Sequence, residues 1–218
     1  MKAGYTHFSV IIDQSGSMQT IKADTEGGLN SFIETQKATP GEATASLTVF
    51  NANVTLVHDF INIQDFPAFT LSPNGNTAML DAIGTTINGL GAKLAAMAEE
   101  DRPEKVAVII ITDGEENASR EFDYAAISRM IETQTNDYKW EFVFLGANIN
   151  AEVMARRISI RAEKAMTFAA NAQGVSATYG SLTKNMSAYR GCSIHEGATM
   201  DFDLADRTAQ EDALKVNP

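Results

Sequence analysis

The chain has 218 residues, enough for one sizeable hydrophobic core, with 44% hydrophobic and 21% charged residues. This composition excludes wholesale disorder, a collagenous repeat and a coiled-coil rod. Its 17 Lys and Arg residues against 28 Asp and Glu residues give a net charge of −11. A surface this acidic repels phosphate backbones and anionic lipids, so we expect neither nucleic-acid nor membrane-surface binding.

A single cysteine, Cys192, excludes an internal disulfide framework and a multi-cysteine zinc site. The longest apolar run, residues 106–111, is far shorter than the roughly 20 residues that a membrane-spanning helix needs. Only residues 1–5 precede the first strand-like segment, so we expect no signal peptide. These features together predict a cytoplasmic location.

Strands and helices are predicted to alternate along the chain. The first strand is almost continuously apolar, which is typical of a strand buried on both faces of a parallel sheet. In chain order we predict a strand at 6–12, a helix at about 19–37, strands at 45–50 and 54–63, a helix beginning near 77, a strand at 105–111, a helix at 119–133, a strand at 140–145, a helix at 150–158, a short strand at 165–168 and a helix at 173–190. Ser119 is a candidate N-cap, and we attribute Gly27 and Gly28 to close packing of their helix on the sheet.

This order of elements predicts an α/β fold with a doubly wound, mostly parallel central sheet and helices on both faces. The two strands at 45–50 and 54–63, joined by a short turn, predict one antiparallel edge strand. One domain, residues 1–190, accounts for the whole pattern. The pattern fades in residues 191–218, which we interpret as an acidic C-terminal tail, either a solvated end or an interaction segment.

Polar residues follow the predicted strands at the edge where open α/β sheets bind ligands. Asp13, Ser15 and Ser17 alternate along one loop, so their side chains can converge on one point. Thr77 and Asp113 lie in two further loops of the same kind. Two carboxylates and three hydroxyls form an all-oxygen set that suits Mg²⁺, or Mn²⁺ as a substitute. If hydroxyls and water bind the ion directly, one coordination position stays open for a carboxylate supplied by a partner.

The run Asp13-Gln14-Ser15-Gly16-Ser17, with Thr77 and Thr112-Asp113-Gly114 in this order, resembles the von Willebrand factor type A family over roughly residues 5–190. The resemblance implies a complete metal-ion-dependent adhesion site in a Rossmann-like fold. Ser15, Ser17 and Thr77 would contact the metal, and Asp13 and Asp113 would bind it directly or through water. It also implies a protein-binding module, similar to the prokaryotic and phage-type intracellular members, that can work within an ATPase-containing assembly.

Two alternatives remain open. A metal-dependent phosphotransferase or hydrolase could use Asp13 as its nucleophile, although Ser15 stands where such enzymes usually carry a second Asp, and no general base is evident. We therefore expect no enzymatic activity. A self-assembling scaffold could instead place the tail acids Asp201, Asp203 and Asp206 in the metal site of a neighbouring copy. Glu115 and Glu116 are expected to lie exposed ahead of the next helix, where acidic side chains suit its dipole.

Overall fold

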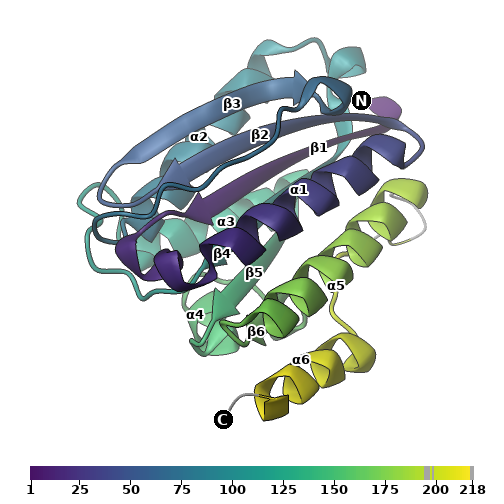
Figure 1. Ribbon diagram of the computed structural model, residues 1–218. Coiled ribbons are helices and arrows are strands. Elements are labelled where there is room, and N and C mark those ends of the chain that lie inside the picture. Colours follow the sequence, from purple (N-terminus) through teal and green to yellow (C-terminus); the bar gives the residue numbers. More distant parts are fainter. Residues whose placement is uncertain (194–196, 198, 217–218) are drawn as a thin grey trace.

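A six-stranded sheet with helices on both faces forms the centre of the computed structural model, which describes residues 1–193, 197 and 199–216 (Figure 1). The strands are β1 (Lys2–Asp13), β2 (Glu42–Phe50), β3 (Val54–Asn62), β4 (Pro103–Thr112), β5 (Glu141–Ala147) and β6 (Ala165–Phe168). They are arranged in the order β3-β2-β1-β4-β5-β6. Every neighbouring pair is parallel except β2 and β3, which are antiparallel. This topology confirms the predicted fold class, including the antiparallel edge strand.

The helices form two layers, one on each face of the sheet (Figure 1). The helices are α1 (Lys22–Ala38), α2 (Met79–Ala96), α3 (Tyr124–Tyr138), α4 (Ala151–Arg157), α5 (Ala172–Gly191) and α6 (Leu204–Val216). Apolar residues of α1 and α5 share one core cluster, and those of α2, α3 and α4 share the other. Within the described part of the chain, no helix combines the length and the apolar character needed to cross a membrane.

The central strand β1 contributes to both cores because its side chains alternate between the two faces of the sheet. Phe8, Val10 and Ile12 pack in the cluster of α1 and α5, whereas Ile11 packs in the cluster of α2. β1 is hydrogen-bonded to β2 on one side and to β4 on the other. The strand that carries Asp13 at its end is therefore held rigidly on every side.

Three local details differ from the prediction. Residues 16–21 form a 3-10 helix, so α1 begins at Lys22. The N-cap of α3 is Asp123, whose carboxylate accepts a hydrogen bond from Ala126 N at 2.7 Å. A Cβ at Gly28 would lie 2.1 Å from Tyr179 Cδ2, so this glycine allows α1 to approach α5 and not the sheet.

The segment expected to be a tail contributes to the core instead. Met200 and Phe202 are buried in the cluster of α1 and α5, and α6 packs beside α5 and β6 (Figure 1). The sequence pattern is weak here because only a few apolar residues reach the core. Residues 194–196, 198 and 217–218 of the expected tail lie outside the described residues.

The tail acids that motivated a scaffold have partners within the chain. Asp201 pairs with Lys164 at 2.9 Å. Lys184 binds both Asp203 at 3.1 Å and Asp206 at 2.7 Å. Asp206 is also buried. These contacts remove the observation on which the scaffold hypothesis depended.

Candidate metal site

The candidate site lies where β1 and β4, two adjacent parallel strands, end at the same edge of the sheet. Asp13 is the last residue of β1, and Asp113 directly follows β4. Thr77 lies two residues before the first residue of α2. Asp13, Thr77 and Asp113, far apart in the sequence, are therefore brought to one edge by the parallel register.

Asp13 is fully buried, and its carboxylate is fixed by two hydrogen bonds. Oδ1 accepts from the backbone N–H of Ser15 at 2.6 Å, and Oδ2 accepts from the hydroxyl of Thr112 at 2.6 Å. The first bond forms an Asx turn, in which an Asp side chain bonds to the backbone two residues later. This turn directs the chain from the strand into the loop that carries both serines.

The two serines connect Asp13's loop to Asp113. The hydroxyls of Ser15 and Ser17 lie 3.0 Å apart, and Ser17 Oγ donates to Asp113 Oδ1 at 2.6 Å. Ser15 is buried, whereas Ser17 is exposed. The row of oxygens therefore runs from the interior to the protein surface, where a partner can reach it.

Thr77 faces the same space as Asp13. A Cβ at Gly114 would lie 3.3 Å from Thr77 Oγ1 and 3.9 Å from Asp13 Oδ2, so both oxygens border the position that Gly114 leaves free. Thr77 is buried, and its backbone N–H donates to Asn117 Oδ1 at 2.9 Å. The structure thus brings together all five residues that the sequence singled out, namely Asp13, Ser15, Ser17, Thr77 and Asp113.

The electrostatics of the site favour a cation. Burial raises the pKa of Asp13 to about 6, against the effect of its hydrogen bonds from Thr112 and Ser15, and the nearby Asp113 raises it further. Burial also raises the pKa of Asp113, while the hydrogen bond from Ser17 lowers it. Two desolvated carboxylates near one another are stabilised in their charged forms by a positive ion.

Three supporting residues were not identified as site residues from the sequence. Thr112 donates to Asp13, and Asn117 holds the backbone of Thr77. The carboxylate of Glu116 accepts four hydrogen bonds, from Leu80 N, Ala118 N and both the N–H and the hydroxyl of Ser119.

Glu116 therefore differs from the prediction, since it is half-buried and bonds to the first turn of α2. Glu115 is exposed, as expected. No local pattern could have separated these two neighbouring glutamates. The two glutamates differ because Glu116 contacts the first turn of α2, which begins at Met79, far from them in the sequence.

The donor set fits a hard divalent ion. Carboxylate and hydroxyl oxygens are the ligands that Mg²⁺ and Mn²⁺ prefer, and Asp13 and Asp113 together balance the charge of one such ion. Among the described residues, no group of three or more His, Cys, Asp and Glu side chains is placed to hold a metal ion. The two carboxylates and three hydroxyls described above form a different kind of set, in which Ser and Thr hydroxyls supply most of the donor groups.

Solved structures with the same architecture include several von Willebrand factor type A proteins. A domain of this type from Catenulispora acidiphila is 14% identical, with a TM-score of 0.59 over 84% of this chain and 43% of its own. Proximal thread matrix protein 1 from the mussel byssus, with a zinc-occupied MIDAS (metal-ion-dependent adhesion site) motif, is 16% identical, with a TM-score of 0.61 over 85% of this chain and 46% of its own. The chain has the von Willebrand factor type A fold.

The pilus adhesin SpaC from Lactobacillus rhamnosus GG is also similar in architecture to this chain, with 13% identity and a TM-score of 0.63 over 86% of this chain and 31% of its own. The present chain thus spans less than half the length of these structures. No protein-family model and no curated protein matches the sequence. At such low identities the likeness establishes the fold alone.

Proposed function

We propose that this chain is a divalent-metal-dependent protein-binding module. Asp13, Ser15, Ser17, Thr77 and Asp113 would hold a Mg²⁺ ion, directly or through water, and the ion would bind an Asp or Glu side chain of a protein partner. The observation that carries the proposal is the series of hydrogen bonds that leads from buried Asp13 to the backbone N–H of Ser15, and from the hydroxyl of Ser15 through that of Ser17 to Asp113. Because Ser17 is exposed, a carboxylate from outside can reach the open position on the ion.

Binding is favoured over catalysis by the state of Asp13. Both of its carboxylate oxygens already accept short hydrogen bonds, and its side chain is fully buried. A carboxylate nucleophile must be able to reach its substrate, and it needs a base or charge that activates it. Asp13 thus has the features of a fixed structural ligand, so we propose that the chain is not an enzyme.

The metal component is tested by adding Mn²⁺ to the protein and measuring water-proton relaxation, with Mg²⁺ as the competitor. We expect saturable Mn²⁺ binding that Mg²⁺ displaces and that is lost in Asp13→Ala and Thr77→Ala. Thr55→Ala, at an exposed position of β3, is the matched control and should bind like the wild type. Equal Mn²⁺ affinity in Thr77→Ala and Thr55→Ala would contradict the proposed site.

The carboxylate component is tested on the Mn²⁺-loaded protein with acetate as the probe. Acetate that joins the ion replaces bound water, so it should lower the relaxation enhancement, and acetamide should not. Partner capture from cell extract should likewise require Mg²⁺ and fail in EDTA. If acetate leaves the relaxation enhancement as unchanged as acetamide does, the ion has no open position for a carboxylate. Binding of a partner carboxylate through the ion would then be wrong, even if the protein binds the metal.

A further inference from the structure

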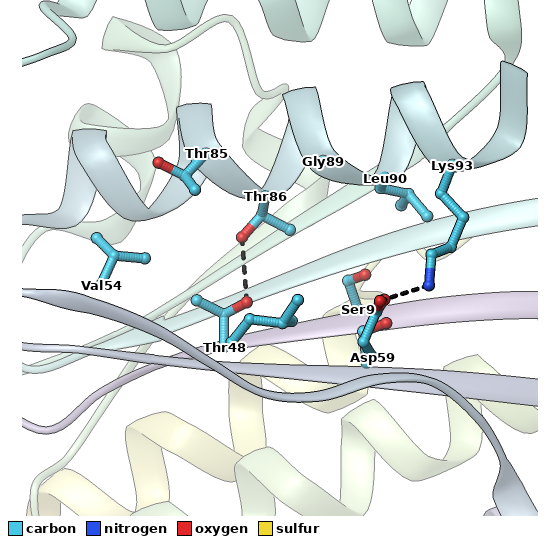
Figure 2. Close-up of a pocket in the computed structure, with 11 residues that line it drawn as sticks. Ser9, Thr48, Val54, Asp59, Thr85, Thr86, Gly89, Leu90 and Lys93 are labelled. Carbon is cyan, nitrogen blue, oxygen red and sulfur yellow. Dashed lines mark hydrogen bonds and ion pairs between the residues drawn. The ribbon is translucent and has the colours of Figure 1, made fainter. Parts of the chain in front are cut away.

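A pocket of about 330 Å³ lies between α2 and the strands β1, β2 and β3, away from the metal-site residues (Figure 2). α2 forms its roof, and the strands form its floor and one wall (Figure 2). None of the five candidate metal ligands lines it. Pockets for small organic molecules usually begin at about this size.

The floor of the pocket is made of hydroxyl groups. Ser9 on β1 and Ser46 and Thr48 on β2 are all buried, with exposed fractions of 1%, 5% and 3%. On the same face of the neighbouring strand β4, the buried side chains are Val108 and Ile110. Burying hydroxyls where the sheet elsewhere buries aliphatic groups costs free energy unless they are hydrogen-bonded.

His7, which lies two residues before Ser9 on the same face of β1, holds the hydroxyl floor in place. Its Nε2 lies 3.1 Å from Ser9 Oγ, and its Nδ1 lies 2.9 Å from Thr44 Oγ1. The ring also stacks on Phe60, with centroids 4.1 Å apart. These contacts fix the imidazole, so the Ser9 hydroxyl is presented to the pocket in one arrangement.

The Ser9–His7 pair does not have the properties of a catalytic pair. Burial lowers the pKa of His7 to about 3, so the imidazole is a weak base. Around Ser9, β1 pairs with β2 on one side and β4 on the other, so its backbone N–H groups there are engaged in the sheet and do not form an oxyanion site. The floor is suited to binding.

The residues around the floor of the pocket indicate that a ligand would be partly apolar and uncharged. Val54, Leu56 and Leu90 supply apolar walls. Leu56 is 54% exposed, which is unusual for a large apolar side chain. Lys93 and Asp59 form an ion pair at one end of the pocket, so their charges cancel (Figure 2). A ligand with a net charge would have to separate this pair.

We propose that this pocket binds a small uncharged amphipathic molecule. Its hydrogen-bonding group would bind the hydroxyls of Ser9 and Ser46, and its apolar body would pack against Leu56 and Leu90. The volume corresponds to roughly ten water molecules, which limits the ligand to about the size of a single substituted ring. The site is independent of the proposed metal-dependent function.

Gly89 on α2 offers a direct test because it lines the pocket and a Cβ there would meet nothing within 4 Å. A leucine at this position is expected to fill the cavity. Gly91, on the same helix, is also open at its Cβ but does not line this pocket. Gly91→Leu is therefore the matched control, with the same gain in helix propensity.

The probe is benzyl alcohol, measured by chemical-shift titration of the folded protein, with toluene and benzoate for comparison. We expect saturable binding to the wild type and to Gly91→Leu, and at least tenfold weaker binding to Gly89→Leu. Toluene lacks the hydrogen-bonding group and benzoate carries a charge, so both should bind more weakly than the alcohol.

Ser9→Ala provides a second test that leaves the cavity open, and it should weaken the binding of benzyl alcohol but not that of toluene. The proposal is overturned if benzyl alcohol does not saturate the wild type. It is equally overturned if Gly89→Leu and Gly91→Leu bind alike, or if benzoate binds as well as the alcohol.

Discussion

Single polar residues in this protein owe their properties to what surrounds them. Asp13 and His7 are both fully buried on β1, on the same face of the sheet as Ile11. Burial favours the uncharged form of each, which raises the pKa of the carboxyl and lowers that of the imidazole. The stability of the fold should therefore depend on pH through both groups, with opposite signs.

The pH dependence that belongs to His7 can be isolated by comparing the wild type with His7→Asn. The folded imidazole has a pKa of about 3, below its value of about 6.5 in the unfolded chain. The unfolded state thus binds the extra proton, and this stability is present above about pH 6.5 and is lost as the pH falls. Relative to the variant, the wild type should lose about 2 kcal/mol of unfolding free energy between pH 6.5 and 5.

Urea unfolding at a series of pH values measures this difference. Asp13 contributes the opposite slope, because its raised pKa means that protonation stabilises the folded state as the pH falls through 6. Asp13 is present in both proteins, so its contribution cancels in the comparison. Parallel curves for the wild type and His7→Asn would mean that His7 is not buried in its neutral form.

Among the elements, α2 and the segment 116–122 are joined by reciprocal capping. Glu116 accepts from Leu80 N in the first turn of α2. In return, Asp81 of α2 accepts from the backbone N–H groups of Arg120, Glu121 and Phe122. Carboxylates in these positions satisfy N–H groups that have no partner within a helix. These hydrogen bonds join the start of α2 to the loop after Asp113, so they also hold Thr77, which lies just before α2, close to that loop.

Glu116→Ala tests this capping, with Glu115→Ala as the control at an exposed neighbouring position. The loss of four hydrogen bonds should lower the unfolding free energy by about 2 kcal/mol, whereas the control should stay within about 0.5 kcal/mol. If the metal site is as proposed, Glu116→Ala should also weaken Mn²⁺ binding by about tenfold. Equal stabilities for the two variants would show that the capping contacts contribute little.

The C-terminal end of α5 depends on a buried lysine of β4. Lys105 Nζ donates to the carbonyl oxygens of Tyr189, Arg190 and Cys192. These carbonyls lie at the end of the helix, where they have no partner within it and where a cation is favoured. Lys105→Met would leave them buried and unpaired.

We expect Lys105→Met to lower the unfolding free energy by about 3 kcal/mol, measured by urea denaturation. Lys22→Met is the control, because Lys22 is partly exposed and its ion pair with Glu26 is long, at 3.9 Å. Such a surface pair contributes about 0.5 kcal/mol or less. A loss of similar size in both variants would contradict the assigned role of Lys105.

On the scale of the whole molecule, the segment 199–216 completes the core that α1 and α5 share. Met200 and Phe202 are buried there, and Phe202 N donates to Glu163 O at 2.8 Å. A chain shortened to residues 1–190 would expose this part of the core to water. The C-terminal segment is therefore part of the folded unit in the structure.

Phe202→Ala should lower the unfolding free energy by about 3 kcal/mol, because it leaves a cavity in the core. Leu204→Ala, two residues later, changes a side chain that is 80% exposed and should have an effect within about 0.5 kcal/mol. Thermal and urea unfolding of both variants measure the difference. If the two behave alike, this segment does not pack on the core in solution.

The sequence by itself determined the alternation of strands and helices, the antiparallel hairpin and the first polar loop. The alternation and the hairpin depend on short-range periodicity. Asp13, Ser15 and Ser17 converge through contacts two residues apart, in an Asx turn that leads into a 3-10 helix. Only the tertiary structure decided which of Glu115 and Glu116 is buried, that Gly28 contacts α5, and that residues 199–216 join the core.

The physical reason is the range of the interactions. The bond from Leu80 N to Glu116 spans 36 residues, and that from Ser17 to Asp113 spans 96. Such bonds leave no periodic trace in the sequence, because one polar side chain and one donor group, which can be a backbone N–H, are sufficient. The hydroxyl-floored pocket likewise required three strands and a helix to be placed together before Ser9 and Gly89 could be seen to share it.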